Sequence, residues 1–363
     1  MIEICAGHQA DLNRWLARHR GQLPTFACLL SFTETGLVDH ISAAGNTPMV
    51  RQYTALADGE FLHSGRTIRY PFPPLAAGVS PAIISRAVIV GQSLPLQLLS
   101  TGLPAALSVP HTALAQVTAK SVDTGQAMTI VQTQALFDSG QRWGQQWGQA
   151  QARQHGSYLV LGECVVGGTT TAQAVLTALG YRVAGQMSSS HPKGNHDQKE
   201  RLVSQGIARW QLRGDPSPLG AVAALGDPMQ PVAAGIALAA SRDGGVLLAG
   251  GAQMLAVYAL AKAIATEKGL SWQSDRIVVG TTRWVIEDIS ANTTAIAQAI
   301  GAPYLASQID FSQSPYARLR AYERGFVKEG VGAGGCAIAA HLYQGWTRSR
   351  LRHAVEAQLR AAY

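Results

Sequence analysis

A carboxylate stands beside a glycine-rich turn near the end of the chain. Glu329 is followed by a turn with four glycines, Gly330 and Gly332 among them, and then by the apolar segment 336–343. Glycine lets a backbone adopt positive φ and approach a ligand closely, and the first N–H groups of a helix can hold an anion or a polar substrate. The pattern predicts a general base beside a bound small molecule. The alternative is a solvated charge ahead of an ordinary helix.

A second glycine turn follows an apolar run in the middle of the chain. Glu163 ends this run, and Gly167, Gly168, Thr169 and Thr170 form the turn that opens the next helical segment. Backbone N–H groups, threonine hydroxyls and the helix dipole together suit a phosphate monoester. An N-capped helix after a strand explains the same residues equally well. The turn lacks the Gly-Lys-Ser/Thr ending of a Walker A loop, so hydrolysis of a nucleoside triphosphate is not supported.

Two other patterns point more weakly to chemistry. Residues 330–335 satisfy GxGxxG, but charged residues precede them and only 28 residues follow, which disfavours a nicotinamide-dinucleotide site. His191, His196 and Asp197 match no standard zinc spacing, so we expect a loop there. No GxSxG motif is present. The sequence therefore predicts neither a metal site nor any other cofactor.

The composition is typical of a globular enzyme with a buried parallel sheet. The 363 residues are 47% hydrophobic and 14% charged, with 38 glycines. The 29 basic and 22 acidic residues give a net charge of +7. Because the basic residues are scattered, we expect small anionic substrates as partners rather than nucleic acid. The densest basic group, residues 348–360, is expected to face solvent on a terminal helix.

The cysteines and the apolar segments bear on location. Cys5, Cys28, Cys164 and Cys336 show no CxxC spacing, which indicates free thiols in a reducing compartment. The N-terminal residues lack the basic and apolar regions of a signal peptide. Segment 244–261 carries no charge, but glycines and a glutamine interrupt it, so we expect a strand and a helix there. These features predict a cytoplasmic protein that does not contact a membrane.

Short apolar runs alternate with helical segments along the chain, and this alternation predicts an α/β fold. We expect a Rossmann-like parallel sheet with helices on both faces, and ligands at the carboxyl ends of the strands. The predicted strands are 26–32, 87–91, 158–161, 245–249 and 276–280, and the predicted helices are 9–20, 170–179, 252–266 and 291–300.

The same pattern predicts two parts of unequal size. Residues 24–311 are expected to form a large α/β nucleotide-binding domain. Residues 1–23 and 312–363 are expected to form a smaller, mainly helical part that carries the Glu329 turn.

Two segments have weaker regular patterns. In 139–155 the side chains of Trp143 and Trp147 have helical i,i+4 spacing, which favours packing over base stacking. Segment 187–197 contains three serines, a proline and a glycine, and is predicted to be a mobile loop over the strand ends.

Both glycine turns resemble the signature loops of one enzyme family. Glu163 with its Gly-Gly-Thr-Thr turn and the segment 328–334 look like two loops of the nicotinate-nucleotide:dimethylbenzimidazole phosphoribosyltransferases. Lys199 lies at about the family's interval after the first loop. The resemblance covers about residues 156–340 and is typical of a divergent branch, with further similar segments at 224–235, 248–257 and 310–314.

The sequence also departs from the family pattern. The family's N-terminal Lys-Pro-x-Gly-Ser-Leu-Gly segment, near its base pocket, is absent, and residues 41–48 stand in its place. The first loop reads Glu-Cys-Val-Val-Gly-Gly-Thr-Thr where the family commonly has Glu-Met-Gly-Ile-Gly-Asn-Thr-Thr. The accepted base therefore stays open.

The resemblance implies a reaction and its partners. It implies transfer of ribose 5-phosphate from nicotinate mononucleotide to a benzimidazole-type or purine base, with inversion at C1′. The product is an α-ribazole-type phosphate for the lower ligand of a cobamide. The resemblance also implies a homodimer that needs no cofactor. The alternatives are a non-catalytic nucleotide-binding or regulatory member of the fold, and a related transferase or hydrolase acting on another nucleotide.

The resemblance also implies roles for the two turns. Glu329 is the general base that takes a proton from the attacking base, and Glu163 lies near the ribose. The turn 167–170 receives the 5′-phosphate, and Lys199 adds a positive charge to it. The glycines after Glu329, Gly330 and Gly332 among them, contact the nucleotide.

Overall fold

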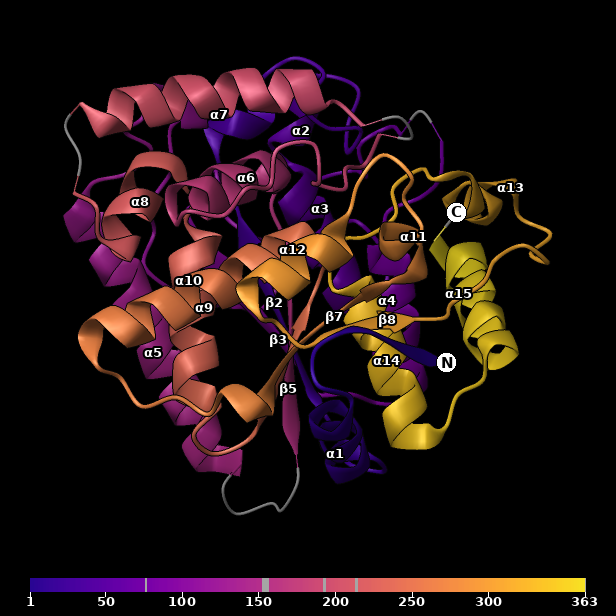
Figure 1. Ribbon diagram of the computed structural model, residues 1–363. Helices are drawn as coiled ribbons and strands as arrows, with labels where there is room; N and C mark the ends of the chain where they lie inside the picture. The colour runs from indigo at the N-terminus through magenta and orange to yellow at the C-terminus, as the bar shows by residue number, and fades with distance from the viewer. Residues whose placement is uncertain (76, 152–156, 192–193, 213–214, 363) are drawn as a thin grey trace.

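The computed structural model describes residues 1–75, 77–151, 157–191, 194–212 and 215–362. These residues form an eight-stranded sheet in the order β1-β8-β7-β6-β5-β2-β3-β4, with helices on both faces (Figure 1). The predicted α/β class is confirmed. The strands are β1 (Ile2–Ala6), β2 (Thr25–Ser31), β3 (Leu96–Thr101), β4 (Thr112–Ala113), β5 (Tyr158–Cys164), β6 (Gly245–Ala249), β7 (Ile277–Thr282) and β8 (Tyr304–Ser307).

The sheet is mixed at one edge, where β1 pairs antiparallel with β8. The other pairs between neighbouring strands are parallel. Strands β2, β5, β6, β7 and β8 are buried along their whole length. This explains their near-continuous apolar sequence, because a parallel sheet is covered on both faces.

Two layers of helices cover the sheet, and alternate strand residues point into each. Leu159 and Leu161 belong to one core cluster, whereas Tyr158 and Val160 belong to the other. The first cluster is covered by α5 (Ile130–Gln151), α6 (Gly168–Ala178), α8 (Pro218–Leu225), α9 (Met229–Ala240), α10 (Ala252–Lys268) and α12 (Thr293–Ile300). The second is covered by α1 (Gln9–His19), α3 (Thr54–Ser64), α4 (Ala82–Gly91), α14 (Ala333–Gln344) and α15 (Arg348–Ala362).

Shorter or outer elements complete the chain. Helix α7 (His196–Gln211) packs on α6 and α8, outside the first layer (Figure 1). The short helices are α2 (Pro48–Arg51), α11 (Arg283–Ile286), α13 (Ala317–Arg320) and the 3-10 helices η1 (Glu34–Leu37), η2 (Val122–Thr124), η3 (Ser274–Arg276) and η4 (Tyr322–Arg324).

The strand predicted at residues 87–91 is wrong, because these residues end helix α4. Ile83, Ile84, Ala87 and Val88 are fully or nearly fully buried at helical spacing, whereas Val90 is 54% exposed. That pattern places one helix face on the core, so tertiary packing overrides the β propensity of the Val-Ile-Val run. The actual strand, β3, begins five residues after the end of the helix and was not predicted from the sequence.

The C-terminal segment contributes to the main sheet. Helix α14 contacts β5, β6, β7 and β8, and α15 packs on α4. The first strand, β1, extends the same sheet, and both ends of the chain lie on one side of the view in Figure 1. The division into 24–311 and a smaller part from 1–23 and 312–363 stays a prediction.

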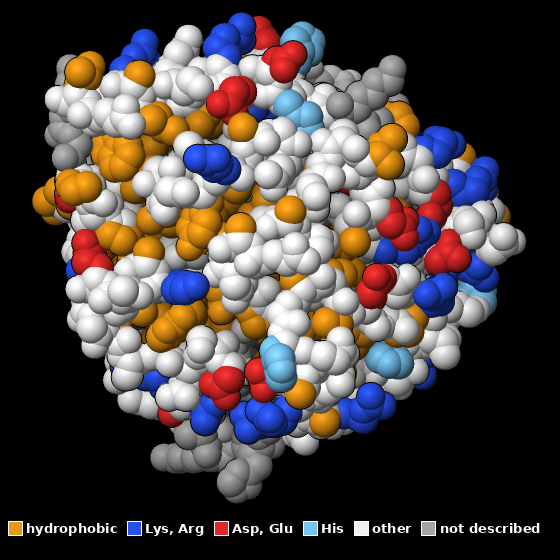
Figure 2. Space-filling view, viewed as in Figure 1, with side chains coloured by type: hydrophobic (Ala, Val, Ile, Leu, Met, Phe, Trp, Pro, Cys, Tyr) orange, Lys and Arg blue, Asp and Glu red, His pale blue; other side chains and the backbone are white. Residues whose placement is uncertain are grey.

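The structure also bears on the predictions for the cysteines, for the segment 139–155, for membrane-spanning helices and for the surface charges. The four cysteines are free, and Trp143 and Trp147 of α5 pack against the first core cluster. Segment 139–155 is helical as far as Gln151, and its remainder lies outside the described residues. Within the described ranges no helix has the length and hydropathy needed to cross a bilayer. On the face drawn in Figure 2, basic and acidic side chains are interspersed.

Candidate active site

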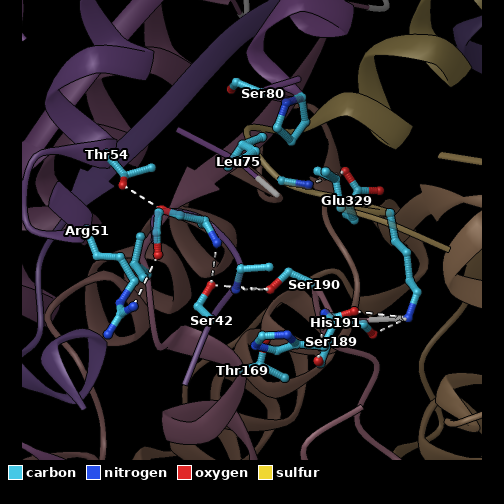
Figure 3. Close-up of a pocket in the computed structure, with 18 of the residues that line it drawn as sticks. Ser42, Arg51, Thr54, Leu75, Ser80, Thr169, Ser189, Ser190, His191 and Glu329 are labelled. Carbon is cyan, nitrogen blue, oxygen red and sulfur yellow. Dashed lines mark hydrogen bonds between the residues drawn. The ribbon is translucent and has the colours of Figure 1, made fainter. Parts of the chain in front are cut away.

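A cavity of about 730 Å³ opens at the carboxyl ends of the strands. Five sequence-distant segments line most of it: the loop and helices from residue 40 to 58, residues 72–75 with 77–81, the end of β5 with the start of α6, the serine-rich loop 188–191, and the turn 326–331. Figure 3 shows side chains from these segments converging on one space. The cavity lies where the topology predicts a ligand site.

Most of the predicted site residues lie together in this cavity. Its walls include Glu163, Gly167, Thr169, Thr170, Lys199, Glu329 and Gly330.

Gly168 and Gly332 do not line the cavity, and packing explains why each is glycine. A Cβ on Gly168 would lie 1.9 Å from Oε1 of Gln253. Gly332 has a φ of +72°, and a Cβ there would lie 2.9 Å from the ring of Phe26. Both positions bring backbone close to a neighbouring element. A direct role for these two glycines in nucleotide binding stays a prediction.

The start of α6 offers an unsatisfied donor to the cavity. The Oγ1 hydroxyl of Thr170 is buried and has no hydrogen-bond partner among the described residues. The next hydroxyl, that of Thr171, is instead occupied, because it donates to Asp227 Oδ2 at 2.5 Å. Because the N-terminus of a helix of 11 residues carries a partial positive charge, this corner of the cavity favours an anion.

Lys199 lies on α7, lines the cavity and is buried. It is 1% exposed, and its Nζ makes no hydrogen bond to any of the residues that the structure describes. Burial and then the nearby charge of Lys328 lower the pKa of Lys199 to about 7, and the charge of Asp288 opposes the shift. Buried lysines are rare unless paired. A bound anion would satisfy both Lys199 and Thr170.

Replacing Lys199 with methionine is expected to weaken anion binding and to stabilise the free protein. The loss of one charge-assisted hydrogen bond predicts about a 10- to 100-fold higher Kd for inorganic phosphate. Because the folded pKa lies below the unfolded value of 10.5, the penalty is complete below pH 7 and fades as pH rises to about 10. Thermal unfolding should show a larger gain at pH 6 than at pH 9.5.

The control for this variant is Lys262→Met. Lys262 lies on α10, away from the cavity walls, where its Nζ donates to the carbonyl of Ile300. This change should leave the affinity for phosphate unaltered. An unaltered phosphate affinity in Lys199→Met itself would remove Lys199 from the anion site.

Glu329 is held by four protein donors at the edge of the cavity. Its Oε2 accepts from Thr281 Oγ1 and from the N–H of Thr282, both at 2.9 Å. Its Oε1 accepts from the N–H groups of Gly330 and Gly334 at 3.0 and 3.1 Å. Burial raises the pKa of Glu329, and these hydrogen bonds limit the rise. Only the Thr281 donor is a side-chain hydroxyl, which can rotate to release a lone pair of Glu329.

The turn that presents Glu329 has an unusual backbone. Val327, Lys328 and Val331 all have positive φ, at 68°, 68° and 53°. Such values are costly for β-branched and other large residues, and they persist only where surrounding contacts impose them. One such contact is the hydrogen bond from Val331 N–H to the carbonyl of Glu163, at 3.0 Å. This bond joins the two predicted signature loops.

A buried ion pair fixes the same turn from the other side. Lys328 Nζ donates to Asp288 Oδ2 at 2.6 Å, and both side chains are 2% exposed. The ammonium group also donates to the carbonyls of Ser189 and His191 at 3.0 and 3.1 Å. Burial alone would raise the pKa of Asp288, but hydrogen bonds from Lys328, Ser290 and Ser188 lower it. The pair ties the Glu329 turn to the serine-rich loop.

Glu163 ends β5 as a buried carboxylate that faces the cavity. It is 3% exposed, and within the described part of the chain its Oε2 has no hydrogen-bond partner. Burial and then the charges of Asp227 and Glu329 raise its pKa to about 8. Glu163 is therefore mostly neutral at pH 7 in the free protein. A positive charge placed beside it would favour its ionised form.

The serine-rich loop closes part of the cavity wall. Ser190 Oγ accepts from the N–H of Ala43 at 2.9 Å and lies 3.2 Å from the Ser42 hydroxyl (Figure 3). Segment 187–197 is a loop up to Asn195, with 192–193 outside the described residues, and α7 begins at His196. His191 and His196 contact the carbonyls of His40 and Ser290.

Sequence reasoning missed three charged residues of the site: Asp58, Asp288 and Arg51. Arg51 is 3% exposed, lines the cavity, and donates to the carbonyls of Gly36, Val38 and Gly45. None of the three lies in a motif. Of the three, Asp288 was the most accessible to prediction, because it lies in the connection after β7, just beyond the short helix α11, and residues that follow parallel strands often form ligand sites.

The site has the features expected of an α/β enzyme for a phosphorylated small molecule, with an anion corner at one end and carboxylates beside it. The model of the phosphoribosyltransferase family DBI_PRT matches residues 90–272, half of the chain, and the chain belongs to this family. The resemblance found from the two glycine turns is thereby confirmed.

Relatives with about half of their residues identical match nearly the whole chain. A UPF0284 protein from Cyanothece sp. (strain PCC 7425) is 54% identical over 346 residues, covering 94% of this chain and 93% of that protein. A UPF0284 protein from Nostoc sp. (strain PCC 7120) is 50% identical, covering 95% of each.

Two similar solved structures come from Thermus thermophilus. CobT has a TM-score of 0.62 at 19% identity, covering 94% of this chain and 90% of that one. A nicotinate-nucleotide-dimethylbenzimidazole phosphoribosyltransferase has a TM-score of 0.56 at 18% identity, covering 96% and 89%. At these identities the likeness establishes the fold.

Proposed function

We propose that the protein transfers ribose 5-phosphate from nicotinate mononucleotide to a benzimidazole-type or purine base, with inversion at C1′. The product is an α-ribosyl phosphate of the kind that supplies the lower ligand of a cobamide. The observation that carries this proposal is the cavity itself. It combines Lys199 and Thr170, which have no hydrogen-bond partner among the described residues and suit a phosphate, with the carboxyl groups of Glu163 and Glu329 in the same cavity walls.

The donor nucleotide fits the charges of the cavity. Its phosphate is proposed to lie at the start of α6, where Thr169 and Thr170 and the helix dipole meet Lys199. Its pyridinium ring carries a positive charge next to C1′. Placed beside Glu163, that charge favours ionisation of a carboxyl group that is mostly neutral in the free protein. The ionised Glu163 then stabilises positive charge at C1′ during transfer.

The proposed transfer breaks one bond to C1′, forms another, and needs one group to accept a proton. The bond between C1′ and the pyridinium nitrogen breaks, and its electron pair neutralises the departing nicotinate ring. A ring nitrogen of the acceptor forms the new bond from the opposite face, and its second ring nitrogen loses a proton to Glu329. The acceptor N–H replaces the Thr281 hydroxyl on Oε2, and that hydroxyl also interacts with Tyr304. General-base help of this kind contributes about 10²–10⁴ in rate.

A direct assay tests this function. The protein is incubated with nicotinate mononucleotide and either dimethylbenzimidazole, adenine or no base, and the products are identified by mass spectrometry and by their anomeric configuration. We expect nicotinate release that depends on the base, with an α-ribosyl phosphate product. Saturable nucleotide binding without product from any base would instead support a non-catalytic binding protein.

A further inference from the structure

Asp58 is a buried carboxylate that lines the cavity and has no part in the reaction described above. It lies on α3 and is 2% exposed. Its Oδ1 accepts from Ser80 Oγ at 2.5 Å, and its Oδ2 accepts from Cys164 Sγ at 3.2 Å. Each oxygen of a carboxylate can accept about two hydrogen bonds. Each oxygen of Asp58 therefore has acceptor capacity left for a ligand.

Among the residues that the structure describes, no cation balances the charge of Asp58. None of the ion pairs within the described ranges includes Asp58. Burial raises its pKa to about 6, and hydrogen bonds from Ser80 and Cys164 limit the rise. The group is thus mostly ionised at neutral pH. A buried anion with two neutral donors is incompletely satisfied and favours a further N–H donor.

Asp58 belongs to the half of the cavity away from the phosphate corner. Helix α3 packs with α4 on one face of the sheet, whereas α6 packs with α7 and α10 on the other. In Figure 3, Ser80 and Leu75 lie at one end of the cavity, Thr169 and Ser189 lie at the other, and Glu329 lies between the two ends. Because the Ser80 hydroxyl donates a hydrogen bond to Asp58, the Asp58 carboxylate lies at the end of the cavity opposite the proposed phosphate site.

The walls around Asp58 suit a flat heterocycle. Residues 72–75 and 77–81 contribute Phe72, Pro73, Pro74, Leu75 and Pro81 to the cavity. Apolar walls with a carboxylate among them can hold a ring and orient it through a polar contact. This end of the cavity is where the acceptor base would enter, next to Glu329.

We propose that Asp58 selects the acceptor base by accepting a hydrogen bond from an N–H group other than the one that Glu329 deprotonates. This inference rests on the proposed transferase function. An aminopurine such as adenine offers an exocyclic amino group in addition to its ring N–H. Dimethylbenzimidazole offers only its ring N–H and two methyl groups. When dimethylbenzimidazole binds, it would shield the Asp58 carboxylate from water without donating a hydrogen bond to it. A buried carboxylate left without this donor lowers the affinity for the base strongly.

The test compares adenine with dimethylbenzimidazole at saturating nicotinate mononucleotide. The unaltered protein should have the higher kcat/KM with adenine. Asp58→Ala should lower kcat/KM for adenine by about 10- to 100-fold, through KM, because it removes a hydrogen bond to a charged acceptor. The value for dimethylbenzimidazole should stay within about twofold or rise. Asp58→Asn, which keeps the shape of the side chain, should show the same direction and carries the test where alanine prevents folding.

Glu60→Gln is the matched control. Glu60 is a buried carboxylate on the same helix, but its Oε2 binds the N–H groups of Ile68, Arg69 and Tyr70 and it does not line the cavity. This variant should lose stability without changing the ratio of the two bases. Equal losses for both bases in the Asp58 variants, or no loss for adenine, would overturn the role of Asp58 and leave the transferase intact. Absence of product with every base would overturn both.

Discussion

Glu329→Gln is expected to lower kcat of the transfer by at least about 100-fold, whichever base is accepted. The amide cannot take up a proton, so the general-base contribution of about 10²–10⁴ is lost. That factor corresponds to about 3–5 kcal/mol of barrier. The amide NH₂ also replaces one of two oxygens that each accept two hydrogen bonds. It would face N–H donors, so local distortion of the turn is expected as well.

Two measurements separate lost chemistry from distortion. The Kd for nicotinate mononucleotide should change by no more than a few fold, because Lys199 and the start of α6 remain intact. Glu323→Gln is the matched control in the same segment, since Glu323 binds Arg283 and the N–H of Phe311 and is not part of the cavity wall. It should retain kcat. An unchanged kcat in Glu329→Gln would exclude Glu329 as the base.

The parts of the site that could be predicted from sequence are those encoded locally. Glu163 and Glu329 each lie within a few residues of a glycine turn, so the turn and the acid are seen together. Because a helical segment follows the strand in the sequence, the turn after β5 is predicted to lie at the carboxyl end of that strand. The family resemblance rested on the same two segments.

The parts that could not be predicted depend on contacts between distant segments. Asp58 meets Ser80 and Cys164 across 22 and 106 residues of chain, and Lys328 meets Asp288 across 40. No local pattern distinguishes these aspartates from solvated ones. The prediction for helix α4 failed for a related reason, because the packing of its buried face decides between helix and strand for a Val-Ile-Val run.

The Lys328–Asp288 pair explains how a turn with three positive-φ residues keeps one conformation. The neighbouring loop 188–191 forms another wall of the cavity. Lys328 donates to two carbonyls of this loop, those of Ser189 and His191, and also to Asp288. The Thr282 hydroxyl adds a hydrogen bond to the Lys328 carbonyl at 2.6 Å. These contacts fix the backbone on one side of Glu329, while Thr281 and Thr282 hold its carboxylate directly.

Asp288→Asn is therefore expected to lower the free energy of unfolding by about 3–5 kcal/mol, the usual cost of leaving one partner of a buried ion pair uncompensated. Lys328 would retain only neutral oxygen acceptors and no counter-charge in a site where its side chain is 2% exposed. Denaturant unfolding at pH 7 measures this loss. Because both walls of the cavity depend on the pair, KM for the nucleotide should rise in the same variant.

A double variant distinguishes an ion pair from two independent contacts. Lys328→Met combined with Asp288→Asn removes the uncompensated charge, so its loss of stability should be smaller than the sum of the two single losses by more than about 1 kcal/mol. Additive losses would mean that the two residues stabilise the fold separately. A loss below about 1 kcal/mol in Asp288→Asn alone would mean that the conformation of the Glu329 turn does not depend on this pair, and that the threonines of β7 determine it instead.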